Sequence, residues 1–128
     1  AVRLSSHPMT ISLLILILFR FVFLLGYVPT ASMEPALKTG SLLLGVRVWG
    51  DIQKGDIIVF QHNKEYLVKR VEAVEGDLIE SNGENLVVPE GGFYVLGDNG
   101  QCSYDSRYWE YPFVMNDDIV AKVILPTR

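Results

Sequence analysis

The chain of 128 residues carries 49% apolar and 20% charged residues and has a formal net charge of −4. This length suits one domain with a modest core, and an acidic chain without a basic stripe is a poor candidate for nucleic-acid binding. The single cysteine, Cys102, excludes an intrachain disulfide. A cysteine nucleophile would need a histidine partner, and only His62 follows the long apolar segment, so a cysteine enzyme is not the interpretation that we favour.

The longest apolar stretch runs from residue 9 to residue 28, after a short tail of residues 1–8. A helix of that length rises about 30 Å, the thickness of the hydrocarbon core of a bilayer. The alternative is a cleaved secretory signal, but the stretch is long and ends in Gly-Tyr-Val-Pro rather than in a small-residue cleavage site. We therefore expect a retained transmembrane helix over 9–28. Arg20 is tolerated there if its side chain reaches the headgroups, and Arg3 favours a cytoplasmic N-terminus.

After residue 40 the sequence is typical of short β-strands separated by Gly, Asn and Pro. No stretch there keeps helical periodicity for three turns, and Asn82 followed by Gly83 is a strong signal for a hairpin turn. We expect a mainly β fold, in which a small coiled or closed antiparallel sheet over 29–128 follows the membrane helix. The expected strands are 42–49, 57–60, 66–74, 78–80, 86–88, 93–96 and 118–125.

Ser32 lies between two prolines, Pro29 and Pro35, which restrict the backbone on both sides. A nucleophile benefits from a loop held in this way, because misplacement by an ångström can cost about a hundredfold in rate. The alternative is that Ser32 caps a short helix running to Leu37. An aliphatic hydroxyl is a weak nucleophile, so the catalytic interpretation requires a base elsewhere in the chain.

Lys69 lies in an expected strand, along which side chains alternate between two faces. It shares its face with apolar residues, whereas Arg70 and Glu72 lie on the other face and look like an ordinary charged surface. Burial among apolar neighbours disfavours the ammonium form and lowers the pKa of a lysine from its reference value of about 10.4, which a general base requires. The alternative is an edge-strand lysine that limits aggregation.

The polar segment 97–107 has the Gly, Asn and Asp content of a tight irregular loop. Asp105 and Arg107 are close enough in sequence to form an ion pair that stiffens it. Ser103 could hydrogen-bond the lysine amine and direct it at Ser32, as the third member of a catalytic set. The alternative is a solvated turn. The spacing of the oxygen-bearing side chains fits no EF-hand loop, and we expect no metal site.

These clusters together resemble the conserved boxes of a known family. Segment 32–35, Ser-Met-Glu-Pro, resembles an S-M-x-P box, and residues 69–71 with 76–77 resemble a lysine box. Segment 97–107 matches G-D-N-x-x-x-S-x-D-S-R, and residues 55–60 resemble a further strand of the same family. The boxes occur in the family's order after an apolar segment. The chain is therefore similar to the type I signal peptidases, membrane-anchored Ser/Lys enzymes that cut leader peptides from exported proteins.

The resemblance implies roles for the matching positions. Ser32 would be the nucleophile and Lys69 the general base, while Thr30 and the Ser32 backbone N–H would form an oxyanion hole. Ser103 would orient Lys69. The positions that would hold the loop are Asp98, Asn99, Asp105 and Arg107. The substrate would bind as an added strand, with shallow apolar pockets for small residues at −1 and −3. The matching pocket positions are Val28, Pro29, Met33, Leu37 and Val68, the last on the strand face opposite Lys69.

The family also implies preprotein substrates, a lipid bilayer as a partner, no cofactor and no nucleic acid. The catalytic domain would lie on the extracytoplasmic side of a membrane, with a bacterial plasma membrane as the first expectation. Within hydrolases, the alternative is a specialised relative such as an organellar inner-membrane peptidase or a plasmid-borne maturation peptidase. From another class, the alternative is a membrane-tethered module that holds extended peptides without turnover, although such a module has no need of Ser32, Lys69 and Ser103 together.

Overall fold

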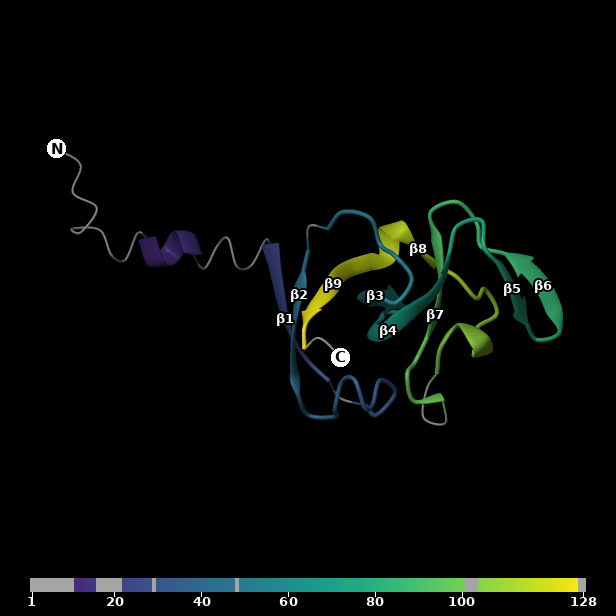
Figure 1. The fold of residues 1–128 in the computed structure, drawn as a ribbon. Coiled ribbons are helices and arrows are strands. Elements are labelled where there is room, and N and C mark those ends of the chain that lie inside the picture. Colours follow the sequence, from purple (N-terminus) through teal and green to yellow (C-terminus); the bar gives the residue numbers. More distant parts are fainter. Residues whose placement is uncertain (1–10, 16–21, 29, 48, 101–103, 127–128) are drawn as a thin grey trace.

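A computed structural model describes residues 11–15, 22–28, 30–47, 49–100 and 104–126 (Figure 1). Its strands are β1 (Phe23–Tyr27), β2 (Leu42–Val46), β3 (Ile57–His62), β4 (Glu65–Val74), β5 (Leu78–Ser81), β6 (Glu84–Val87), β7 (Gly92–Leu96), β8 (Val114–Met115) and β9 (Ile119–Leu125). Two short 3-10 helices, η3 (Ser106–Tyr108) and η4 (Asn116–Asp118), lie between the last strands. The expectation of a mainly β fold is confirmed, and each strand expected from the sequence has a counterpart whose ends differ by a few residues.

The larger sheet has the order β1-β2-β9-β3-β4-β7-β8, and its neighbouring strands pair antiparallel. Its register shifts at Leu44/Gly45, Val59/Phe60 and Val71/Ala73. Such shifts bend strands and increase their twist. The sheet accordingly curls, so that β1 and β2 stand at one side of the domain and β7 and β8 at the other (Figure 1).

Strand β3 lies at the centre of this sheet and is covered on both faces. Val59 belongs to a core cluster that also contains Met33, Leu37 and residues of β2 and β9. Ile58 and Phe60 belong to a second cluster with residues of β4, β7, β8 and β9. A strand that is buried on both faces needs a continuous apolar run rather than an alternating one, and 57–60 supplies it.

A separate hairpin formed by β5 and β6 projects from one end of the domain (Figure 1). Its turn is the Asn82–Gly83 pair, with φ of 53° and 80°. Both angles are positive, as a type I′ turn requires, and Asn and Gly adopt them most readily. The hairpin turn predicted from these two residues is therefore confirmed.

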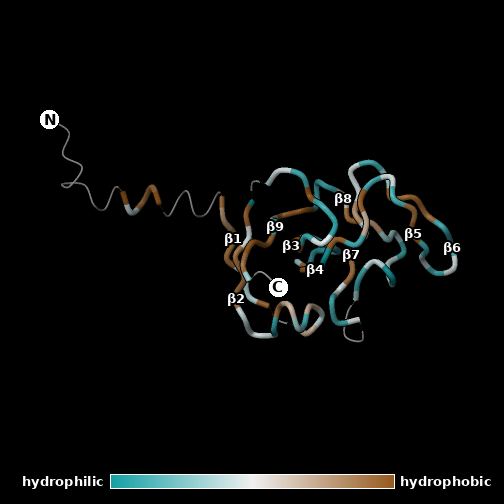
Figure 2. The backbone as a smooth tube through the Cα atoms, viewed as in Figure 1, coloured by the Kyte–Doolittle hydropathy of each residue, from teal (hydrophilic) through white to brown (hydrophobic). Residues whose placement is uncertain are grey.

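The N-terminal apolar stretch differs from the expectation in one respect. Residues 11–15 are helical, but the end of the expected helix is strand β1, which pairs with β2 from Phe23↔Val46 to Tyr27↔Leu42. A helix over the whole of 9–28 is therefore wrong for residues 23–27, because a neighbouring strand satisfies their backbone groups and apolar content alone does not separate helix from strand. Figure 2 shows the apolar character of 11–15 and of β1. No helix within the described residues is long and apolar enough to cross a bilayer, and Arg20 lies outside those residues.

Candidate active site

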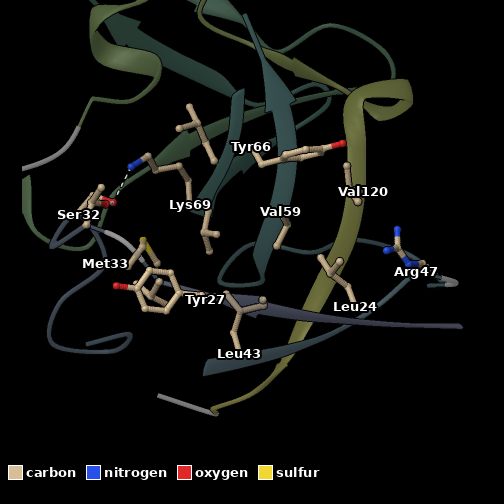
Figure 3. A pocket seen from close by; sticks show the side chains of 15 residues that line it. Leu24, Tyr27, Ser32, Met33, Leu43, Arg47, Val59, Tyr66, Lys69 and Val120 are labelled. Atoms are coloured by element: carbon tan, nitrogen blue, oxygen red, sulfur yellow. Dashed lines mark hydrogen bonds between the residues drawn. The ribbon is translucent and has the colours of Figure 1, made fainter. Parts of the chain in front are cut away.

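Ser32 and Lys69 meet in the fold although 37 positions separate them. Ser32 lies in a turn after β1 and is 5% exposed, and Lys69 lies in β4 and is 3% exposed. Lys69 Nζ and Ser32 Oγ are 2.7 Å apart and hydrogen-bonded (Figure 3). The structure thus places a buried amine directly against a buried hydroxyl.

The position of Lys69 follows from the alternation of β4. Its neighbours Leu67 and Val71 pack with the core cluster that contains Ile58, which is also the register partner of Lys69. Val68 points the other way and packs with Val59. Burial lowers the pKa of Lys69; the carboxylate of Asp105 opposes this effect, and the positive charge of Arg107 adds to it.

The Ser32 turn is held from beneath by Met33 and Leu37, which are 1% and 0% exposed. Leu37 N donates to Met33 O at 2.9 Å, but residues 31–37 form turns rather than a helix. Among the described residues, the Ser32 hydroxyl is hydrogen-bonded to Lys69 and to Thr30, whose Oγ1 lies 3.3 Å from Ser32 Oγ. The hydroxyl therefore faces other side chains and does not act as a helix cap.

Segment 97–100 packs against this turn. Asn99 N donates to Ser32 O at 2.8 Å, which fixes the backbone of the serine. The adjacent Asp98 carboxylate accepts two hydrogen bonds of 2.8 Å from the Arg70 guanidinium, which also donates to Gly55 O at 2.7 Å. The pKa of Arg70 is raised by this pairing. The interpretation of Arg70 as an ordinary surface charge is wrong, because it joins β4 to two loops.

Asp105 is fully buried and its carboxylate is well satisfied. It accepts hydrogen bonds of 2.8 Å from Arg107 Nε, from Arg107 Nη2 and from Gly97 N. The ion pair expected between Asp105 and Arg107 is present. Through these contacts the carboxylate closes the loop back onto the end of β7. Ser103 and Cys102 lie outside the described residues.

We expect the Arg70–Asp98 pair to stabilise the domain measurably. Arg70→Gln should lower the free energy of unfolding by about 1–3 kcal/mol, because Asp98 loses a charged bidentate partner in a partly buried site. Urea unfolding measures the change. Lys54→Gln is the matched control, because the Lys54–Asp77 pair is more exposed and such pairs contribute about 0–1 kcal/mol. Equal losses in the two variants would contradict the assigned role of Arg70.

A groove of about 490 Å³ leads away from the Ser32–Lys69 pair. Three of the predicted pocket positions, Val28, Met33 and Val68, line it. Leu37 lies in the core beneath and is not part of the lining, and Pro29 is outside the described residues. The motifs gave no signal for the remaining apolar and aromatic lining residues, which are Leu24, Gly26, Tyr27, Leu43, Val59, Tyr66, Leu67 and Val120.

Two strand edges border this groove without a partner strand among the described residues. Strand β4 pairs with β3 along Glu65–Arg70, but its other edge pairs with β7 only from Arg70 to Val74. Strand β1 pairs with β2 alone. Residues of both strands line the groove, so an extended peptide has hydrogen-bonding backbone on either side.

A buried serine in contact with a buried amine, at the end of a peptide-sized groove, is typical of a serine endopeptidase. The family described as "Signal peptidase, peptidase S26" matches residues 2–88 and 82–127, and the chain belongs to this family. The chain is a serine endopeptidase that cleaves leader peptides.

Two relatives illustrate the similarity. The chain is 29% identical to "Signal peptidase I" of Leptolyngbya laminosa over 141 residues, which cover 82% of this chain and 68% of that protein. It is 29% identical to "Signal peptidase IB" of Staphylococcus aureus over 138 residues, which cover 72% of this chain and 71% of that protein. The similarity thus extends over most of each chain.

Proposed function

We propose that this leader peptidase works through a Ser32–Lys69 dyad and an acyl-enzyme. The observation that carries the proposal is the 2.7 Å contact between Lys69 Nζ and Ser32 Oγ, with both residues buried. A lysine whose pKa is lowered by burial can be uncharged at working pH and can accept a proton. Neither residue would react at neutral pH without the other.

The reaction begins when neutral Lys69 takes the proton of Ser32 and Oγ bonds to the scissile carbonyl carbon. The tetrahedral oxyanion is stabilised by the Thr30 hydroxyl and the Ser32 backbone N–H. The Lys69 ammonium then protonates the leaving amine, and the C–N bond breaks. Neutral Lys69 then takes a proton from a water molecule as the water oxygen attacks the ester carbonyl carbon. The Lys69 ammonium returns this proton to Ser32 Oγ as the ester C–O bond breaks, which releases the new carboxyl group and restores Ser32 and neutral Lys69.

The segment beside the dyad supplies the supporting groups. Ser103 is the proposed partner that orients the Lys69 amine; its place in sequence, two residues before the buried Asp105 whose charge acts on Lys69, supports this role. Asp98 and Asn99 hold the Ser32 turn through Arg70 and through the Ser32 carbonyl, respectively. Asp105 and Arg107 keep the loop closed.

The substrate would be a preprotein whose leader lies as an added strand between β1 and β4. In that conformation residues −1 and −3 point the same way, toward an apolar lining that includes Val28, Met33 and Val68. Such a lining accepts small side chains and rejects charged ones. We therefore propose small residues at −1 and −3 as the specificity.

The apolar residues before β1 would anchor the enzyme, with its catalytic domain on the extracytoplasmic side of the membrane. Exposed apolar side chains on the neighbouring strands β1, β2 and β9 support contact with lipid. They are Leu25, Tyr27, Leu42 and Leu125.

The test is to incubate detergent-solubilised protein with a panel of precursors, including pilin-like ones, and to sequence the new N-termini. We expect cuts after small residues, together with an acyl adduct on Ser32 in the intact mass of the trapped enzyme. A narrow substrate range would favour a specialised maturation peptidase. Tight binding of precursors with neither a cut nor an adduct would contradict the proposal and favour the binding-only module.

The proposed oxyanion hole makes Thr30 important for turnover. Thr30→Val keeps the shape of the side chain but removes the donor, and should lower kcat by about 10²–10³-fold with little effect on KM. Thr30→Ser, which restores a hydroxyl, should recover most of the rate. Steady-state kinetics on one precursor measures both variants. Full activity of Thr30→Val would exclude the hydroxyl from the oxyanion hole.

A further inference from the structure

The groove has a charged end that the proposed chemistry does not use. Arg47 lines it together with Leu24 and Val120, on the side away from the Ser32–Lys69 pair (Figure 3). Arg47 Nε donates to Phe23 O at 3.1 Å, and its backbone N donates to Val22 O at 2.6 Å. The guanidinium is therefore held at the start of β1, where it is half-buried.

No carboxylate balances this charge among the residues that the structure describes. The described lining of the groove contains no Asp or Glu, and Arg47 forms no ion pair with a described residue. The pKa of Lys69, the other cation of the lining, is lowered by burial. With Nε engaged by Phe23, the two terminal NH₂ groups of Arg47 can donate to a ligand, and a mostly apolar groove strengthens their attraction for oxygen acceptors.

The distance along the strand fixes which part of a bound peptide Arg47 meets. Val28 lies next to the Ser32 turn, and Phe23, which holds Arg47, lies five residues before it. A strand rises about 3.3 Å per residue, so a peptide beside β1 passes Arg47 about five residues from the scissile bond. The groove that accepts residues −1 and −3 continues to Arg47, so these five residues belong to the leader.

We infer that Arg47 is a specificity-determining residue that binds the leader's oxygen acceptors about five residues before the scissile bond, a carboxylate side chain best of all. A leader ends its apolar helix shortly before the cleavage site, and the last helical carbonyls, which carry partial negative charge, are further acceptors of this kind. The inference rests on the proposed function only in taking the groove as the leader's site.

The experiment uses sets of precursors that are identical except for Glu, Gln or Lys at one of the positions −4, −5 and −6, in a nonionic detergent. At the position that meets Arg47, the kcat/KM of the wild type should be highest for Glu, lower for Gln and lowest for Lys. The value for Glu should be about three- to tenfold above that for Gln. Arg47→Gln should remove this difference, and Arg47→Lys should keep its direction. Lys38→Gln, which removes an exposed positive charge at the dyad end, should keep the wild-type order.

The same peptides, labelled with a fluorophore, are titrated onto Ser32→Ala protein with and without Arg47→Gln. The Kd should be lowest for Glu and highest for Lys, and Arg47→Gln should remove these differences. This result supports the inference even if the wild type cleaves nothing and the proposed function fails. Equal Kd and kcat/KM for Glu and Gln at all three positions would overturn the inference. A preference that Lys38→Gln abolishes equally would also overturn it, and so would an effect of Arg47→Gln that is uniform over all peptides.

Discussion

Ser32→Ala protein is expected to cleave precursors about 10⁴–10⁶-fold more slowly than the wild type, below detection in an ordinary assay. In the proposed mechanism the hydroxyl oxygen forms the bond to the scissile carbonyl carbon, and Ser32 is the only described side chain that is hydrogen-bonded to Lys69. Binding of the leader should persist, because the groove and its strand edges are unchanged. Kinetics on one precursor, with Kd measured in parallel, separates the two effects.

The matched control for this substitution is Ser41→Ala. It removes a hydroxyl that donates a hydrogen bond to Lys38 O and does not contact the dyad. It should cleave at the wild-type rate. The free energy of unfolding of the Ser32→Ala domain should lie within about 1–2 kcal/mol of that of the wild type, because the hydrogen bonds to Lys69 and Thr30 are lost. Cleavage by Ser32→Ala at a rate near that of the wild type would rule out Ser32 as the nucleophile.

Lys69→Met is expected to reduce kcat by about 10⁴-fold or more, because Met preserves the length of the side chain but cannot take a proton. The same variant should be more stable than the wild type at neutral pH. Burial lowers the pKa of Lys69 in the folded state, so the unfolded chain binds a proton there that the folded chain binds less well. Folding at pH 7 therefore works against protonation, at about 1.4 kcal/mol for each unit of pKa depression.

The stability advantage of Lys69→Met over the wild type should decrease as the pH rises. The wild-type stability should rise with pH from the lowered pKa of folded Lys69 up to the unfolded value of about 10.4, and the difference from Lys69→Met should shrink over that window. Urea unfolding of both proteins at pH 7 and near pH 10.5 measures it. A Lys69→Met protein that is less stable than the wild type at pH 7 would contradict the assignment of an unfavourably buried amine.

The predictable part of the structure is the part that local patterns encode. Apolar runs and turn residues give the strands, and Asn82 with Gly83 gives the hairpin turn because few other pairs adopt two positive φ angles. The alternation of β4 predicts that Lys69 faces a core, and the cluster around Leu67 and Val71 agrees. The resemblance of the motifs around Ser32 and Lys69 to those of the family then predicts that the two side chains meet.

The parts that could not be predicted depend on long-range pairing. Residues 23–27 look like the end of an apolar helix until β2 is placed beside them, because hydropathy is the same in both states. Arg70 looks like a surface charge until the loop that carries Asp98 returns to it. Leu37 belongs to the core rather than to the groove because its turn folds inward beneath Ser32. Arg47 joins the groove only through the pairing of β2 with β1.

The charge state of Lys69 is the central claim, and its most direct measurement is an NMR titration of ¹³C-labelled lysine side chains, with Lys69→Met used to assign the signal. The account predicts that Lys69 titrates below the lysine reference of about 10.4 and below the exposed lysines of the same sample. A Lys69 signal that titrates together with the exposed lysines would contradict the account.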